Sequence, residues 1–124
     1  MTSPVSVLVF AGKTYIGRAE IQPLQPRMGV YGGRFDPEFT YPTVEPAIRR
    51  LMECTMDPSA GEAELRSAFR ERDSLQLEVR SDAGFVFHPA AVHIQDATAW
   101  NPLAPIELHL LGLPPEEAKA AFGT

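Results

Sequence analysis

The chain has 124 residues, 44% of them hydrophobic and 22% charged, with a formal net charge of −5 and one cysteine, Cys54. This length and composition are typical of one globular domain with one core, and they exclude an intramolecular disulfide. They also exclude a membrane-spanning helix, which needs about 18 consecutive apolar residues. We therefore expect a single domain over residues 1–124, in a reducing, cytoplasmic compartment and without a membrane partner.

The first third of the chain alternates apolar and polar residues, a pattern that predicts strands. Residues 5–10 and 14–21 predict two strands joined by a turn at 11–13. No basic residue precedes the first apolar run, so we expect a strand there rather than a signal peptide. Residues 22–27 contain two prolines and predict an extended connection, and residues 28–35 predict a third strand.

The apolar period then changes from two to between three and four, which predicts two helices. The first is amphipathic, begins near Val44 with Thr43 as its N-cap, and ends before Asp57. The second covers residues 61–72. Cys54 lies on the apolar stripe of the first helix, so we expect a buried thiol rather than a nucleophile.

Strands return in the last third of the chain, over residues 74–80, 85–88, 91–96 and 105–113. A short helix over residues 114–122 follows, with proline at its start and Gly123 behind it. Runs of strands joined by short turns predict an α+β fold. We expect a mainly antiparallel sheet of five to six strands, with two main helices packed on one face and a short C-terminal helix.

The charges are unevenly divided along the chain. Residues 1–56 carry six Lys/Arg and five Asp/Glu, whereas residues 57–124 carry five and eleven. The basic residues are interleaved with glutamates, so we expect no nucleic-acid partner, which would need a clustered basic surface. The acidic half instead favours encounters with a basic protein.

Two glycine motifs resemble phosphate-binding loops but lack the required spacing. "AGKT" at 11–14 ends like a nucleotide-binding loop, but Val7 stands where that motif needs a glycine. Gly29, Gly32 and Gly33 do not have the spacing of the dinucleotide fingerprint. We expect no cofactor, and we interpret Gly32 and Gly33 as a bulge or a place where another element packs closely.

Three polar side chains are candidate metal ligands. Strand phase puts His93, His109 and Glu107 on the face opposite the apolar positions, where they would meet if their strands are neighbours. No pair has a diagnostic spacing, so solvated side chains are the simpler interpretation. The phase of His88 cannot be read across Pro89.

Aromatic residues with arginine are typical of protein interfaces and also of cores. This leaves both alternatives open for six interface candidates, which are Tyr31, Arg34, Phe35, Phe39, Tyr41 and Trp100. The phase of the third strand places Phe35 on the same side as Tyr31 and Arg34 on the other. We identify no catalytic residues.

The runs "MGVYGGRFDPEFTYPTVEPAIRRL" and "LEVRSDAGFVFHPAAVHIQD" resemble a group of small bacterial single-domain proteins. The resemblance covers about the middle two-thirds of the chain. It implies a stand-alone bacterial domain in the cytosol, and it implies no activity and no site residue.

Three functional hypotheses follow from the sequence. The leading one is a non-enzymatic protein-binding module with an acidic binding surface, such as a toxin-neutralising immunity protein or a similar regulatory partner. The second is a small metal- or ligand-binding enzyme that uses His93, His109, Glu107 and Arg34. The third is a homo-oligomeric structural protein that associates through a strand edge or through the aromatic region.

Overall fold

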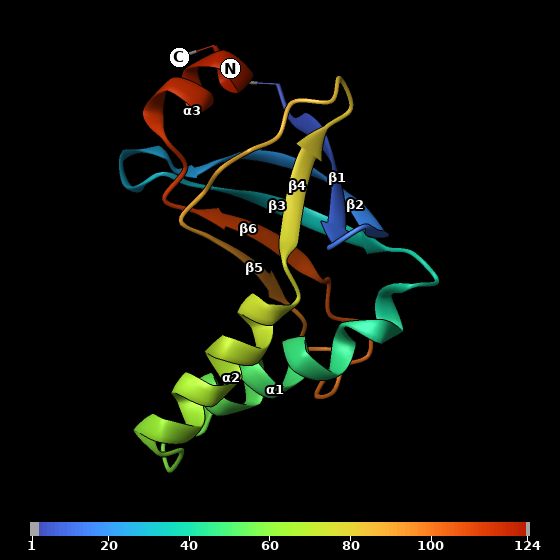
Figure 1. Ribbon diagram of the computed structural model, residues 1–124, viewed down its shortest axis with the longest axis vertical. Coiled ribbons are helices and arrows are strands. Elements are labelled where there is room, and N and C mark those ends of the chain that lie inside the picture. Colours follow the sequence, from blue (N-terminus) through green and yellow to red (C-terminus); the bar gives the residue numbers. More distant parts are fainter. Residues whose placement is uncertain (1–2, 124) are drawn as a thin grey trace.

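Six strands form one antiparallel sheet in the computed structural model, which describes residues 3–123. The strands are β1 Val5–Ala11, β2 Thr14–Gln25, β3 Val30–Pro37, β4 Leu77–Ser81, β5 Ala91–Gln95 and β6 Glu107–Leu111. Their order across the sheet is β4-β1-β2-β3-β6-β5, so β4 and β5 are its two edges. The sheet curls into a half-barrel (Figure 1). The predicted α+β class is confirmed.

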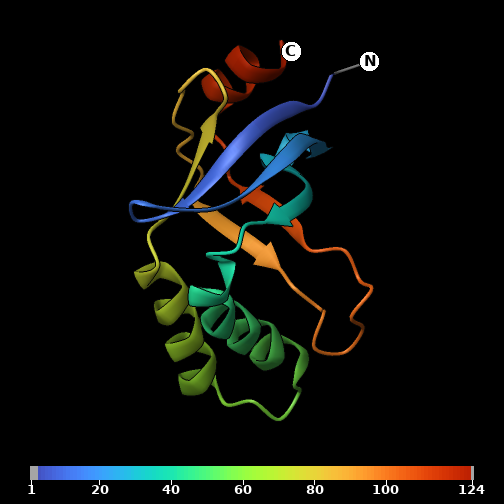
Figure 2. The same ribbon diagram turned by 90° about the vertical axis from the view of Figure 1, so that its right-hand side faces the viewer.

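Alternation along each strand fills the inside of the curl with apolar side chains. Val7 and Val9 of β1, Val79 of β4, and Leu108 and Leu110 of β6 are fully buried. Tyr31 and Phe35 of β3 belong to the same core, as the phase of that strand predicted. The alternate positions along the strands are mostly polar. The helices lie at the two ends of the sheet (Figures 1 and 2).

Three α-helices lie at the two ends of the curled sheet. Helices α1 (Glu45–Met56) and α2 (Glu62–Ser74) pack against each other at one end, and α3 (Pro115–Phe122) lies at the opposite end (Figure 2). The core continues into both ends, through Ile48 of α1 and Phe122 of α3. Of the helices in residues 3–123, none is long and apolar enough to cross a membrane.

Three local predictions need correction. Residues 85–88 do not form a strand but make one isolated bridge, Arg80 to Val86, because this segment crosses between the two edges of the sheet. Residues 22–25, predicted as a connection, extend β2 instead, where they pair with β3. Thr43 is not the N-cap of α1, because residues Tyr41–Thr43 form a 3₁₀ turn and Val44 takes that position.

The two glycines of β3 are places of close approach. A Cβ at Gly33 would lie 1.9 Å from the carbonyl oxygen of Glu20, and one at Gly32 would lie 2.4 Å from that of Leu108. Side chains at these positions would force the neighbouring strands apart. The interpretation of the glycine pair as closely packed backbone is therefore confirmed.

Candidate functional site

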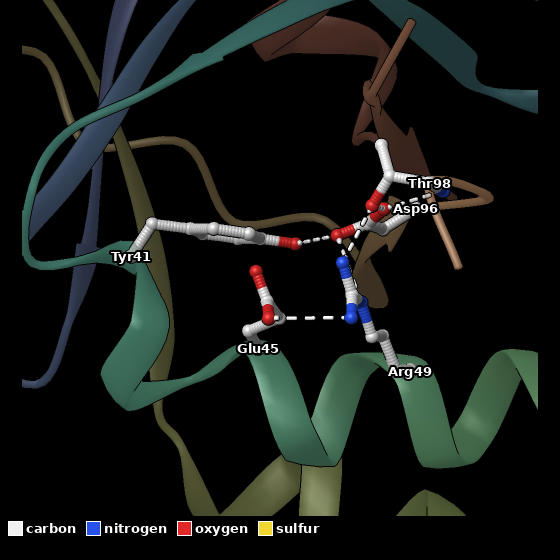
Figure 3. A network of polar contacts seen from close by, with 5 residues as sticks. All are labelled: Tyr41, Glu45, Arg49, Asp96 and Thr98. Carbon is white, nitrogen blue, oxygen red and sulfur yellow. Dashed lines mark hydrogen bonds and ion pairs between the residues drawn. The ribbon is translucent and has the colours of Figure 1, made fainter. Parts of the chain in front are cut away.

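A buried carboxylate joins the end of β5 to the start of α1. Asp96 follows β5 directly and is fully buried. The hydroxyl of Tyr41 donates a hydrogen bond of 2.7 Å to its Oδ2 (Figure 3). Its Oδ1 accepts two bonds from Thr98, one from the backbone N–H at 2.9 Å and one from the hydroxyl at 2.5 Å. Both carboxylate oxygens are therefore hydrogen-bonded, as a buried charge requires.

Arg49 of α1 supplies the opposite charge. Its Nε lies 3.8 Å from Asp96 Oδ2, and its Nη1 lies 3.4 Å from Glu45 Oε1. Its Nη2 donates a hydrogen bond of 2.7 Å to the hydroxyl of Thr98 (Figure 3). Arg49 thus ties the first turns of α1 to the segment that follows β5.

The charge states of Asp96 and Tyr41 are fixed by their surroundings. Burial alone would raise the pKa of Asp96, but the hydrogen bonds from Thr98 and Tyr41 and the charge of Arg49 outweigh it and hold this pKa below its usual range. Burial and the bond to Asp96 raise the pKa of Tyr41 far above its usual range. At neutral pH the phenol keeps its proton and the carboxylate lacks one, so the contact is a fixed structural link.

This network anchors two surface loops at one point. We call residues 38–40 and 97–104 the loop pair; the first leads into Tyr41 and the second follows Asp96. The first loop is held by a backbone bond of 2.9 Å from Glu38 N–H to the carbonyl of Ile16, and by a bond from the Thr40 hydroxyl to the carbonyl of Tyr15.

The longer loop of the pair is fixed by its own hydrogen bonds. The backbone N–H groups of Trp100 and Asn101 both donate to the carbonyl of Ala97 at 3.0 Å. The side chain of Asn101 accepts a bond of 3.1 Å from the N–H of Leu103. Turns of this kind give an irregular segment a defined backbone shape.

The loop pair presents large apolar side chains to solvent. Phe39 is 89% exposed, Trp100 is 52% exposed and Leu103 is 92% exposed. Exposed aromatic side chains on a rigid scaffold are the features that protein-binding sites use as anchors. Other exposed apolar side chains lie outside the loop pair, at Leu24, Met28, Met56, Phe69 and Phe85.

The six predicted interface residues divide between core and surface. Tyr31, Phe35 and Tyr41 are at most 3% exposed and are wrong as interface candidates. Their rings pack inside the curl, where Tyr31 stacks on Phe122 with centroids 4.7 Å apart and Phe35 packs against Tyr41 at 5.6 Å. Phe39, Trp100 and Arg34 are exposed. Arg34 lies apart from the loop pair, on β3 opposite Glu107 of β6.

The histidines meet as strand phase predicted. His93 and His109 face each other directly across β5 and β6, and their rings are stacked with centroids 6.2 Å apart. Glu107 Oε1 lies 3.5 Å from His109 Nε2. His88 lies elsewhere and pairs with Glu117 at 3.0 Å. Within residues 3–123 no three His, Cys, Asp or Glu side chains are grouped so as to hold a metal ion.

The acidic half of the chain is largely paired. Of the eleven Asp and Glu residues in 57–124, seven lie within 4.0 Å of an Arg or His nitrogen. These seven are Glu71, Asp73, Glu78, Asp82, Asp96, Glu107 and Glu117. The negative charge of this half is therefore spread over ion pairs in several elements.

Sequence reasoning missed Asp96, Arg49 and Leu103. Asp96 and Thr98 form an Asp-x-Thr turn, a local signal that predicts a capped loop after the strand. The bond from Tyr41 to Asp96 joins positions 55 residues apart, and no local pattern indicates it.

Comparison of the chain with protein families, curated proteins and solved structures found no significant match. The resemblance to small bacterial proteins therefore stays a prediction.

Proposed function

We propose that this protein is a non-enzymatic protein-binding module that contacts its partner through the loop pair. One observation carries the proposal: Phe39, Trp100 and Leu103 are exposed on loops whose backbones are fixed to the buried Asp96 network. Loops that already hold one shape lose little conformational entropy on binding, so more of the contact energy is available for affinity.

The exposed apolar side chains of the loop pair and the net charge of the whole protein suit a protein partner. Burying an exposed Phe or Leu side chain contributes roughly 1.5–3 kcal/mol, so three such anchors can dominate an interface. The net charge of −5 steers a basic partner towards the molecule at low ionic strength. A toxin-neutralising immunity protein or a similar regulatory protein would combine these properties.

Affinity capture with matched variants tests the proposal. The purified protein is immobilised, exposed to extract of the native cell at low salt, and the bound proteins are quantified by mass spectrometry. We expect one partner that wild type retains and the Phe39→Ser/Trp100→Ser variant loses. The control is Met28→Ser/Met56→Ser, which removes two exposed apolar side chains outside the loop pair and should retain the partner.

The same capture can contradict the proposal. Retention of the partner by the loop-pair variant at the wild-type level would place the contact elsewhere. A wild-type protein that captures nothing above the level of an unrelated acidic protein would remove the support for a partner altogether.

The stacked imidazoles favour a second candidate, binding of a metal ion or small ligand on the outer face of the sheet. It predicts that metal copurifies with wild type and is lost in the His93→Ala/His109→Ala variant. Metal analysis of both proteins decides this, and equal metal content in the two would end the idea.

A further inference from the structure

A hollow lies at the open seam of the half-barrel. The edge strands β4 and β5 do not pair, and residues 85–90 cross between them (Figure 1). The crossing segment is fixed at both ends, by a bond of 3.0 Å from Phe87 N–H to the carbonyl of Val79 and one of 3.3 Å from Ala90 N–H to that of Gly112. Between this segment, β4 and the end of α2, the hollow has a volume of about 460 Å³.

A buried arginine forms one wall of the hollow. The side chain of Arg72, near the end of α2, is only 10% exposed. Its Nε and Nη2 donate to Asp73 Oδ1 at 3.3 and 3.0 Å, and its guanidinium lies 5.1 Å from the centre of the Phe69 ring. These contacts hold the guanidinium in one orientation.

The remaining nitrogen of Arg72 has no partner in the described chain. Nη1 makes no hydrogen bond within residues 3–123, and it is not fully enclosed, because the one fully buried unpaired side-chain atom there belongs to Arg49. Arg72 lines the hollow with a side chain that is 10% exposed, and Nη1 is its one nitrogen without a hydrogen-bond partner among the described residues.

Gln76 lines the same hollow in a strained backbone conformation. Its φ of 54° is the one positive value at a non-glycine residue in the described part of the chain. It follows the C-cap of α2, where glycine is the favoured residue. This positive φ ends α2 and turns the chain into β4 at the wall of the hollow.

The other polar groups of the hollow leave Arg72 free for a ligand. Two carboxylates line the hollow. Asp73 accepts the hydrogen bonds from Nε and Nη2 of Arg72, and Glu78 Oε2 lies 2.5 Å from Arg80 Nη2. The rest of the wall includes the apolar side chains of Leu77, Val86 and Val92 and the side chain of His88, which pairs with Glu117.

We propose that this hollow binds a small organic acid, with its carboxylate on Arg72 Nη1 and its apolar body against Leu77 and Val86. A guanidinium donates charge-assisted hydrogen bonds to carboxylates, and a small apolar cavity with few polar groups is the usual form of a ligand site. The hollow uses no residue of the loop pair, so this inference stands or falls separately from the proposed function.

Titration of ¹⁵N-labelled protein with benzoate, followed by NMR, tests the inference on wild type alone. We expect shifts of the Arg72 Nε–Hε signal and of amides in residues 76–78 and 86–92. Benzamide has the same shape without the charge and should bind at least about tenfold more weakly, since a hydrogen bond to a charged group contributes about 1.5–3 kcal/mol. Equal binding of benzamide, or shifts spread over the surface arginines, would overturn the inference.

Two variants locate the binding on Arg72. Arg72→Met keeps the aliphatic stem and should lower benzoate affinity at least about tenfold, whereas Arg70→Met, at an exposed position of the same helix, should leave it unchanged. Unchanged affinity in a folded Arg72→Met protein contradicts the inference. A tripeptide with a blocked N-terminus and a free C-terminal Phe carboxylate tests whether the ligand is instead the C-terminus of a peptide chain. Binding of this peptide tenfold tighter than benzoate would identify the ligand as a chain terminus and not a small acid.

Discussion

At the scale of single residues, β3 depends on glycine where β2 crosses closest to it. A methyl group at position 33 would lie 1.9 Å from the Glu20 carbonyl oxygen, which belongs to backbone and cannot turn away. We therefore expect Gly33→Ala to lower the free energy of unfolding by about 3 kcal/mol or more. Urea denaturation measures this. Gly61→Ala is the control, because nothing lies within 4 Å of a Cβ there, and equal losses in the two variants would contradict the account.

Gln76 stores strain that glycine would relieve. In the left-handed region a side chain costs roughly 1 kcal/mol relative to glycine, so Gln76→Gly should raise the free energy of unfolding by about 0.5–1 kcal/mol. Gln76→Ala removes nearly the whole side chain but keeps the strained Cβ, and it should give no such gain. Chemical denaturation of both variants distinguishes backbone strain from side-chain effects, and equal stabilisation in both would show that strain is not the cause.

At the scale of elements, the Asp96 network joins α1 to the end of β5. Tyr41→Phe removes one of the donors to a buried carboxylate, so we expect a loss of about 1–3 kcal/mol in the free energy of unfolding. Tyr15→Phe is the matched control, because within residues 3–123 the Tyr15 hydroxyl makes no hydrogen bond. If both variants unfolded at the same denaturant concentration, the bond to Asp96 would contribute nothing.

His93, which lies where β5 pairs with β6, makes the stability of the fold depend on pH. Burial lowers the pKa of His93, and the charges of Arg72 and His109 lower it further. The unfolded chain therefore takes up a proton more readily than the folded one, and stability falls as the pH drops below about 6.5. We expect the urea midpoint to decrease from pH 7.5 to pH 5.5. His93→Gln should reduce this decrease, whereas the exposed His88→Gln should not.

Elements differ in how well the sequence predicts them. The strands and the two main helices follow from periods of two and of three to four, because each buries one face. Strand phase placed His93 and His109 on the same face, and the pairing of β5 with β6 brings them together. Residues 85–88 look like a strand but cross the open seam, a position set by the curl of the whole sheet. The contact of Tyr41 with Asp96 depends on the packing of distant segments, which a local pattern does not contain.

At the scale of the whole molecule, α1 and α2 lie at one end of the curled sheet (Figure 2). The loop pair is tied to the start of α1 through Tyr41 and Asp96. The exposed side chains Phe39, Trp100 and Leu103 belong to loops that are anchored to a buried charge network. Composition did not distinguish buried aromatic residues from exposed ones, because cores and interfaces both contain aromatic residues. The fold buries Tyr31 and Phe35 and exposes Phe39 and Trp100. A basic partner is expected from the net charge, so its association rate should fall as ionic strength rises.

Photo-crosslinking in the native cell shows whether the loop pair contacts another protein. A photoreactive phenylalanine analogue replaces Phe39 or Trp100 in one pair of variants, and Met28, which is exposed outside the loop pair, in a control. We expect a discrete adduct with one other protein from positions 39 and 100 and none from position 28. The same adduct from position 28 in equal yield, or no adduct from either loop-pair position, would contradict it.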